Sequence, residues 1–358
     1  TKQNPQPAGT EVRLEDSWGT ETTKVIKTSN GEEETEITKV ATVYAVSVGD
    51  GETVPVPKNF YYVGGNLSTG VIISDNSEDK YESGKDKTTY DYTTSLKGNQ
   101  FVWIPVSNIS SSDVSNEKNV LNYDGSKFLI FLGRYNKLSN GSFSPEQLAS
   151  DYSKESELTI DNIKYREIST SSQGTSGSGN SGNNATAFDL NGFISSVEKN
   201  KGFYYARYEA SKGSDGKAKS KANQNAWTGI TQLEASSKSR SMYTTNNGVR
   251  TDLINSYAWS TALEYINKMG SSDYINKKNT VTSILKTGQS GDKACNIYDM
   301  SGNISEWTTE TATNSTGKCT YIGGGIGQQQ GTAFSRYVSD TVSKSNSISF
   351  RVIMYIDN

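Results

Sequence analysis

Three short runs of aromatic and β-branched residues, far apart and separated by long polar tracts, constrain the fold of this 358-residue chain most strongly. The runs cover residues 101–106, 202–210 and 348–356, and each predicts a strand. Apolar residues make up only 32% of the chain, well below the usual ~45–50% (a figure that also counts Gly). The 5 Trp, 10 Phe and 21 Tyr nevertheless distinguish it from disordered chains, which lack aromatic residues. The sequence therefore predicts a folded protein with a modest core and long polar loops.

The first 52 residues are expected to form a small N-terminal β domain or a filament-linking segment. Short alternating or β-branched runs fill this segment, and Asn30-Gly31 is a strong hairpin signal between two of them. Pro55-Val56-Pro57 then interrupts the pattern. We place a boundary here, so that residues 53–358 form the second domain.

The second domain mixes strand-like runs with helical patterns, so we assign the chain to the α+β class with little regular secondary structure. Helices are expected near 193–197, over 227–242 and over 253–269, where Gly270 marks a stop. Polar, irregular composition predicts two loop insertions, near residues 74–98 and 107–185.

Histidine is absent from the chain, which excludes Ser-His-Asp triads, Cys-His dyads and His-ligated zinc sites. The only two cysteines, Cys295 and Cys319, form no CxxC motif, so thiolate zinc sites and thioredoxin-type chemistry are not expected. An even cysteine count in a chain rich in Ser, Thr, Asn, Gly and Tyr fits a secreted protein with one disulfide. Two ordinary buried thiols are the alternative.

Charge and hydropathy exclude two further classes. Lys and Arg number 36 against 39 Asp and Glu, a net charge of −3, so no general attraction to nucleic acid or anionic membranes is expected. No apolar run approaches the ~18 residues that cross a membrane as a helix. The first residues do not resemble a signal peptide, and we expect an upstream targeting or anchoring segment.

Four blocks occur in a particular order along the chain. They are the run at 202–210, the helical pair carrying Trp227 and then 253–259, the block N-I-Y-D-M-S-G-N-I-S-E-W at 296–307, and Gly323-Gly324-Gly325 followed by S-F-R-V at 349–352. This order resembles the formylglycine-generating enzyme (sulfatase-modifying factor) family, a variant of the C-type lectin fold. The resemblance covers roughly residues 55–358, and its specific part is 296–307.

Within that family the chain looks most like surface proteins of Gram-positive gut bacteria that follow a prepilin-type leader. The shared phrases are P-V-P-K-N-F-Y-Y-V-G-G at 55–65, G-N-Q-F-V-W-I-P at 98–105 and I-S-F-R at 348–351. The resemblance implies a C-type lectin fold after the small β unit. It also implies an extracellular protein, at the cell surface or on a filament.

The same resemblance bears on catalysis. Family enzymes hold copper through two thiolates in the segment equivalent to 326–337, which contains no Cys here. Iron-dependent relatives need several His ligands, so neither copper nor iron is expected. Cys295 and Cys319 flank the block 296–307, which favours a disulfide between them over a metal site. The resemblance therefore implies a catalytically inactive chain, with a metal-dependent oxidoreductase as the alternative.

Proteins of this fold also bind ligands, and variable proteins of diversity-generating retroelements place their variable residues in the interval equivalent to 326–347. Tyr supplies rigid contact area there, and polar side chains supply hydrogen bonds. An ordinary polar loop is the alternative. The expected partners are a glycan or protein on another cell surface, or like subunits in a filament. The candidate ligand-binding residues are Gln328, Gln329, Gln330, Phe334, Arg336, Tyr337, Ser339 and Asp340.

The family turn equivalent to 301–306 can hold calcium through an Asn oxygen and a Glu carboxylate, which suit a hard cation. Asn303 and Glu306 match that motif and are the candidate calcium ligands. The alternative is a turn held by hydrogen bonds, in which Glu306 pairs with an Arg such as Arg351. Taken together, the expected function is binding or display, such as adhesion, compatible with a pilin-like filament subunit.

Overall fold

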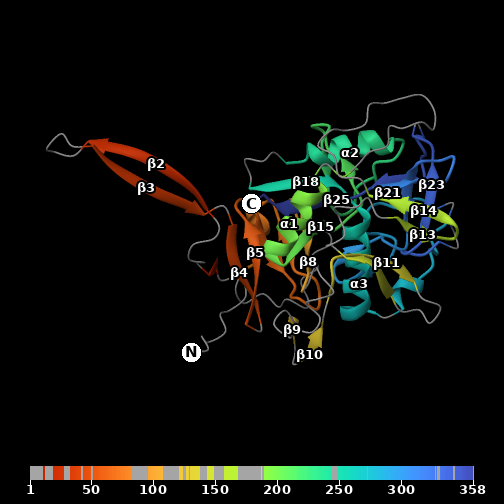
Figure 1. Cartoon of the computed structure of the whole chain (residues 1–358), viewed down its shortest axis with the longest axis horizontal. Helices are drawn as coiled ribbons and strands as arrows, with labels where there is room; N and C mark the ends of the chain where they lie inside the picture. Colours follow the sequence, from red (N-terminus) through yellow and green to blue (C-terminus); the bar gives the residue numbers. More distant parts are fainter. Residues whose placement is uncertain are drawn as a thin grey trace.

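The computed structural model combines antiparallel sheets with a few helices, which confirms the α+β class (Figure 1). Two six-stranded sheets form most of the body, and three α-helices lie in the part of the chain that is described. The structure describes residues 11–12, 19–27, 33–41, 43–49, 51–82, 96–107, 121–123, 126–128, 130–137, 143–148, 157–167, 187, 189–243, 248–271, 273–326, 328, 331–341 and 343–357.

The central sheet joins strands from five distant parts of the sequence, all antiparallel. Gly202–Ala206 of the second predicted run lies between Gln100–Pro105 and Val352–Ile356, so the three runs meet in this sheet. The predicted strand 348–356 is broken at Arg351, and its first part, Ile348–Phe350, pairs in the other sheet. In spatial order the strands are β18 (Val249–Leu253), β25 (Val352–Ile356), β15 (Gly202–Ala206), β8 (Gln100–Pro105), β7 (Ile72–Ser74) and β6 (Tyr61–Gly64).

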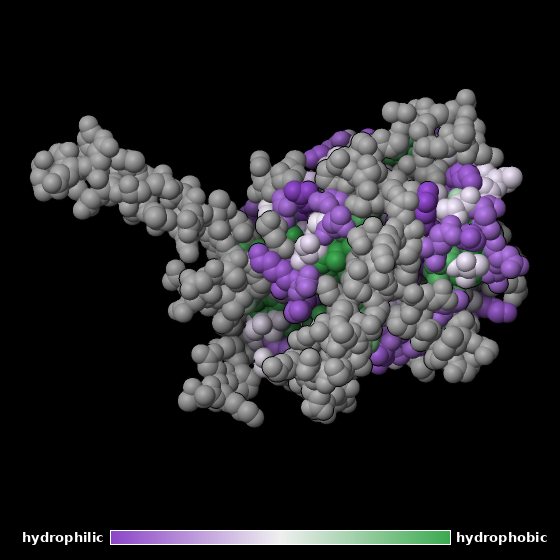
Figure 2. Space-filling view, viewed as in Figure 1, coloured by the Kyte–Doolittle hydropathy of each residue, from purple (hydrophilic) through white to green (hydrophobic). Residues whose placement is uncertain are grey.

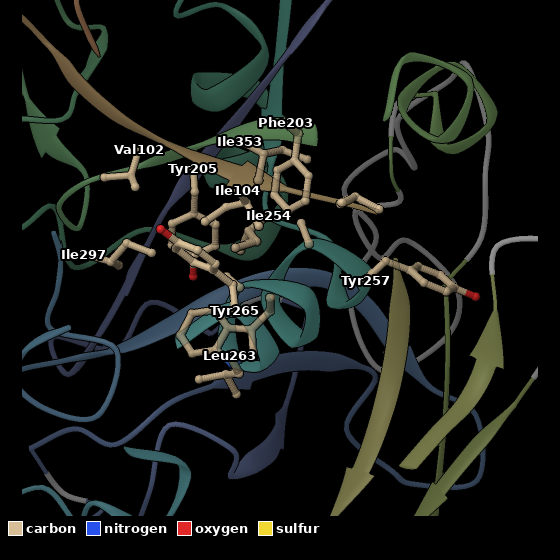
Figure 3. Close-up of a cluster of buried hydrophobic side chains, with 14 of the residues drawn as sticks. Val102, Ile104, Phe203, Tyr205, Ile254, Tyr257, Leu263, Tyr265, Ile297 and Ile353 are labelled. Carbon is tan, nitrogen blue, oxygen red and sulfur yellow. The ribbon is translucent and has the colours of Figure 1, made fainter. Parts of the chain in front are cut away.

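Successive side chains of this sheet enter two different core clusters, because residues of a strand alternate between its faces. Phe203 and Tyr205 join one cluster, while Tyr204 and Ala206 join the other. Helix α3 (Ser256–Met269) covers the first cluster, and Figure 3 shows side chains of the sheet pointing toward this helix. The core is thus rich in aromatic residues, as the composition requires.

The second sheet carries the candidate ligand-binding segment at its edge. Only one of its pairings, between β21 and β24, is parallel. The strands are β13 (Leu158–Ile160), β14 (Ile163–Arg166), β21 (Ser305–Ala312), β22 (Cys319–Ile322) and β23 (Arg336–Ser339), with β24 (Ile348–Phe350) beside β21.

The expected domain boundary at residue 52/53 needs correction, because it lies inside a hairpin. Strand β4 (Val43–Gly49) pairs with β5 (Glu52–Pro57), and β1 (Glu11–Val12) pairs with β4. Val46 and Val48 of β4 and Val54 and Val56 of β5 belong to the same core cluster as Tyr204. The Tyr204 hydroxyl donates to the Pro55 carbonyl at 2.8 Å. Residues from Val43 onward therefore pack on the body of the protein. The hairpin of β2 (Gly19–Lys27) and β3 (Glu33–Ala41) projects from it in Figure 1.

The helices follow the predictions in part. Helix α1 (Leu190–Asn200) covers the predicted segment, and α3 (Ser256–Met269) ends before Gly270 as expected. Helix α2 (Gln232–Arg240) is shorter than predicted, since a capping box between Thr231 and Glu234 fixes its start. None of the described helices has the length and apolar character needed to cross a membrane.

Both predicted insertions contain ordered parts. In the first insertion, Asp79 links the two ends of the segment. Its carboxylate accepts from the backbone N–H groups of Lys97 and Gly98 at 2.9 and 2.8 Å. Residues 83–95 lie outside the described part. The second insertion includes β13 and β14 of the second sheet. The remaining short pairs are β9 (Leu121–Tyr123) with β10 (Ser126–Phe128), β11 (Gly133–Lys137) with β12 (Phe143–Leu148), β16 (Ser211–Lys212) with β17 (Ala218–Lys219), and β19 (Lys293–Ala294) with β20 (Ile297–Tyr298).

Candidate functional site

Three aromatic rings form a ladder across β21, β22 and β23, which we call the aromatic ladder: Trp307, Tyr321 and Tyr337. The strand register places Trp307 opposite Tyr321, and Tyr321 opposite Tyr337. The ring centroids are 5.6 Å apart in the first pair and 5.2 Å apart in the second, which is stacked. Trp307 is buried, whereas both tyrosines are half-buried. The ladder therefore runs from the core to the edge of the sheet.

The turn before β23 contacts the two tyrosines of this ladder. Gln328 lies 3.5 Å from the Tyr321 hydroxyl, measured from its amide nitrogen. Gly331 leaves room for the Tyr337 hydroxyl, since a Cβ at residue 331 would lie only 2.5 Å from it. The lack of a side chain at Gly331 thus lets the tyrosine reach its position.

The structure divides the predicted ligand-binding residues into three groups. Gln328 and Tyr337 meet at the ladder, and Ser339 and Asp340 follow at the end of β23. Phe334 packs against the core, with the Arg336 guanidinium 5.6 Å from its ring centre. Gln329 and Gln330 lie outside the described residues.

Arg336 points into the protein, which corrects its assignment as a surface ligand residue. Its side chain is only 2% exposed, and its Nε donates to Glu310 at 3.0 Å. Glu310 also accepts from Arg134, and both of these side chains are fully buried. Desolvation alone would raise the pKa of Glu310, but the two guanidinium groups outweigh it and lower that pKa. The ion pair between Arg336 and Glu310 thus holds the edge strand β23 against the interior of the protein.

A second carboxylate, Glu167, completes this buried group. It accepts from the Ser256 backbone N–H at 2.6 Å, at the start of α3, and from the Thr309 hydroxyl at 2.7 Å. Desolvation, followed by repulsion from Glu310, raises the pKa of Glu167 to about 7 despite these hydrogen bonds and Arg134. The fold therefore favours the protonated form of Glu167.

This raised pKa predicts a pH dependence of stability. The native state holds the proton of Glu167 up to about pH 7, whereas the unfolded chain releases it near its ordinary value, so stability falls as pH rises between the two. From pH 5 to pH 8, the wild type should lose about 2 kcal/mol more unfolding free energy than Glu167→Gln. Urea unfolding of both proteins at the two pH values measures this difference. An equal loss of unfolding free energy from pH 5 to pH 8 in both proteins would contradict this prediction.

The candidate calcium ligands lie in a second buried group of charges. Both carboxylate oxygens of Glu306 accept from Arg351, the nearest contact to Nε being 2.9 Å on Oε2. Asn303 donates to Glu209 at 2.6 Å and accepts from the Leu285 N–H at 2.9 Å. The alternative of a hydrogen-bonded turn with a Glu306–Arg351 pair is therefore confirmed.

Arg351 already occupies the carboxylate oxygens of Glu306 that the predicted calcium site would use. A cation on Glu306 would face the Arg351 guanidinium on the same carboxylate oxygens, and like charges repel strongly in a buried site. Among the described residues, no group of three or more Cys, Asp or Glu side chains is arranged to hold a metal ion.

The expected disulfide between Cys295 and Cys319 is wrong, because both thiols are free and buried. Cys295 belongs to the core cluster closed by α3, with its Sγ 3.7 Å from the Ser68 carbonyl oxygen. Cys319 lies on β22 in the cluster on the other face of the central sheet. Burial raises the pKa of each thiol to about 12, so both stay protonated at neutral pH.

Tyr321 was missed by the sequence analysis because it precedes the Gly-rich landmark that opens the candidate interval. The alternation within Cys319–Ile322, ahead of three glycines, could have indicated a strand there. Figure 2 shows many hydrophilic residues, with some hydrophobic ones among them, at the end of the molecule that carries β13, β14 and β23.

Comparisons with known proteins give no family assignment. No family model matches the chain, and no curated protein matches it. Among solved structures, it is similar to CarF at 15% identity, covering 44% of this chain and 88% of CarF, with a TM-score of 0.33. It is also similar to the U1 variant of Major Tropism Determinant at 12% identity, covering 88% of this chain and 82% of that one, with a TM-score of 0.33. Scores at this level carry no argument about function.

Proposed function

We propose that this chain is a catalytically inactive, extracellular binding or display protein with a C-type lectin fold of the formylglycine-generating enzyme type. The sequence blocks that carry that resemblance support the proposal, with 296–307 as the most specific. A role in adhesion fits, as does display from the cell surface or a pilin-like filament. The expected partner is a glycan or protein of another cell.

The aromatic ladder is the observation that carries the proposal. Tyr321 on β22 and Tyr337 on the edge strand β23 are stacked and half-buried, and Trp307 supports them from the core. A tyrosine held in this way offers an apolar ring face and a hydroxyl to a ligand at little cost in conformational entropy. The C–H faces of a sugar ring suit that surface, so a glycan is the ligand that we favour.

The thiols support binding over oxidation. A copper site of the family type needs two thiolates close together, and here the two thiols lie in separate core clusters. Both are protonated at neutral pH, so neither is prepared to bind a soft metal.

A polysaccharide array tests the proposal. The wild type is expected to bind at least one glycan, and Tyr337→Ala and Tyr321→Ala should each weaken that binding about tenfold, equivalent to about 1.4 kcal/mol. Tyr61→Ala is the matched control, since Tyr61 is a half-buried tyrosine on β6 of the other sheet. Binding that survives both ladder substitutions, or oxidation of cysteine peptides by the purified chain, would contradict the proposal.

A further inference from the structure

The segment that leads into helix α2 holds one indole ring, that of Trp227, half-buried at the surface. The Trp227 backbone N–H donates to the Ala210 carbonyl at 2.7 Å. The indole packs on Phe350, with ring centroids 5.7 Å apart, and Phe350 lies opposite Trp307 in the strand register. Trp227 therefore continues the row of rings beyond the buried end of the aromatic ladder, in a position that these contacts fix.

Two lysine side chains, which we call the lysine pair, lie over this indole: Lys212 on β16 and Lys238 on α2. Their Nζ atoms lie 5.4 and 5.9 Å from the centre of the Trp227 ring, which is the range of a cation–π contact. Among the described residues, neither ammonium group forms an ion pair or a hydrogen bond within the protein. The ring thus holds two positive charges near each other.

The chain around the lysine pair is basic. Residues 211–243 carry six Lys or Arg against two Asp or Glu, a net charge of +4, whereas the whole chain has a net charge of −3. Arg240 is paired with Asp252, which lies outside this range, at 3.0 Å. With that pair taken into account, the segment still has an excess of positive charge.

Both carboxylates of this segment already have cations of their own. Asp215 pairs with Lys219 at 2.9 Å. Glu234, on the same helix as Lys238, pairs with Lys344 through Oε1 at 2.7 Å, and its Oε2 accepts from the Thr231 backbone N–H at 2.9 Å. Neither carboxylate is therefore available to neutralise the lysine pair.

Two uncompensated ammonium groups favour an oxyanion as ligand. Each ammonium group has three N–H donors and no acceptor. Hydrogen bonds between charged partners are about twice as strong as neutral ones. A sulfate ester stays ionised at neutral pH and presents three terminal oxygens, so it can accept from both ammonium groups.

Other polyanions fit this surface less well. Proteins that bind single-stranded nucleic acids stack bases on aromatic rings, and here the lysine pair lies over the ring. Binding at a membrane surface uses large apolar side chains that enter the lipid. Among the described residues, Ile284 is the only large hydrophobic residue that is exposed, and it lies outside residues 211–243. A sulfated polysaccharide needs neither feature.

We propose that the lysine pair binds a sulfate group of a sulfated polysaccharide, at a site separate from the aromatic ladder. The inference goes beyond the proposed function, because it adds a second site with a ligand class of its own. Trp307 and Phe350, which lie between Trp227 and the ladder tyrosines, are fully buried. A sugar chain therefore cannot follow the row of rings, and the lysine pair acts independently of Tyr321 and Tyr337.

Heparin and desulfated heparin test this inference, because both keep their carboxylates and differ in sulfate. At low NaCl the wild type should bind heparin about tenfold more tightly, and salt should reduce this preference by screening the charges. Lys212→Gln/Lys238→Gln should abolish the preference, whereas Lys212→Arg/Lys238→Arg, which keeps both charges, should retain most of it. Lys58→Gln/Lys199→Gln removes two exposed lysines elsewhere and is the matched control.

Trp227 gives the test a local readout that does not depend on the lysine variants. The chain has 5 Trp, so its nitrogen–proton NMR spectrum contains few indole N–H signals, and Trp227→Phe identifies the signal of this ring. Heparin should shift the Trp227 signal and leave that of the buried Trp307 in place. Desulfated heparin should shift neither.

Four results would overturn the inference: equal wild-type affinity for both polymers, a preference that survives the glutamine double variant, an equal loss in the matched control, or an unshifted Trp227 signal. A DNA duplex bound as tightly as heparin through the lysine pair would overturn the choice of a sulfated glycan. If heparin binding needs Tyr337 and not the lysine pair, the proposed function stands without this inference. If the lysine pair carries the preference and no glycan depends on Tyr337, the inference stands and the ladder proposal fails.

Discussion

Replacing Arg351 with Met should lower the free energy of unfolding by about 3–5 kcal/mol, the usual cost of removing one partner of a buried ion pair. Arg351 is fully buried and donates to both oxygens of Glu306 and to the carbonyls of Ala206 and Tyr298, at 3.0 and 2.8 Å. The substitution would leave the Glu306 carboxylate buried without its counter-charge. Urea unfolding followed by tryptophan fluorescence measures the loss.

Two companion variants separate charge from packing. Arg351→Lys keeps the charge but loses the bidentate geometry of the guanidinium group. Its free energy of unfolding should therefore lie between those of Arg351→Met and the wild type. Arg351→Met/Glu306→Leu removes both charges and should recover part of the lost stability. A single Met variant as stable as the wild type would show that the pair contributes nothing to the fold.

Replacing Glu310 with Leu should have an effect of similar size, about 3–5 kcal/mol, because it leaves two buried guanidinium groups facing each other. Glu310 accepts from Arg134 and from Arg336, and its own side chain is fully buried. Since Arg336 holds β23 in place, the substitution should also weaken glycan binding at Tyr337. Thermal unfolding and the array measure the two effects.

Lys344→Gln is the control for this second prediction, because Lys344 forms an ion pair with Glu234 in which both side chains are about half exposed. Such surface pairs contribute about 0–1 kcal/mol. If Glu310→Leu changed stability no more than Lys344→Gln, the buried group would not hold the edge strand.

The three aromatic runs predicted the core correctly because alternation along a strand is visible in the sequence. The boundary at 52/53 was wrong, because Pro55 and Pro57 were interpreted as the end of the strand pattern. They lie in β5, an edge strand, where a missing N–H is tolerated. Strand β18 was not predicted, and its last residue, Leu253, was assigned to the helix over 253–269 because it fits the helical spacing of the residues after it.

The candidate site was predicted in part for similar reasons. The pairing of Glu306 with Arg351 was foreseen as an alternative, since a buried carboxylate needs a partner. The inward direction of Arg336 depends on Glu310 and Arg134, whose proximity is a property of the folded sheet. The prediction of a disulfide was wrong, because two cysteines that flank the block 296–307 in the sequence need not lie on the same face of a sheet.

Hydrogen–deuterium exchange with and without the most tightly bound polysaccharide of the array tests the central proposal most directly. It reports which backbone amides the ligand protects. The proposal predicts protection in peptides covering Cys319–Ile322 and Arg336–Ser339, with none over Tyr61–Gly64. Protection confined to the central sheet, with the two ladder strands unchanged, would contradict it.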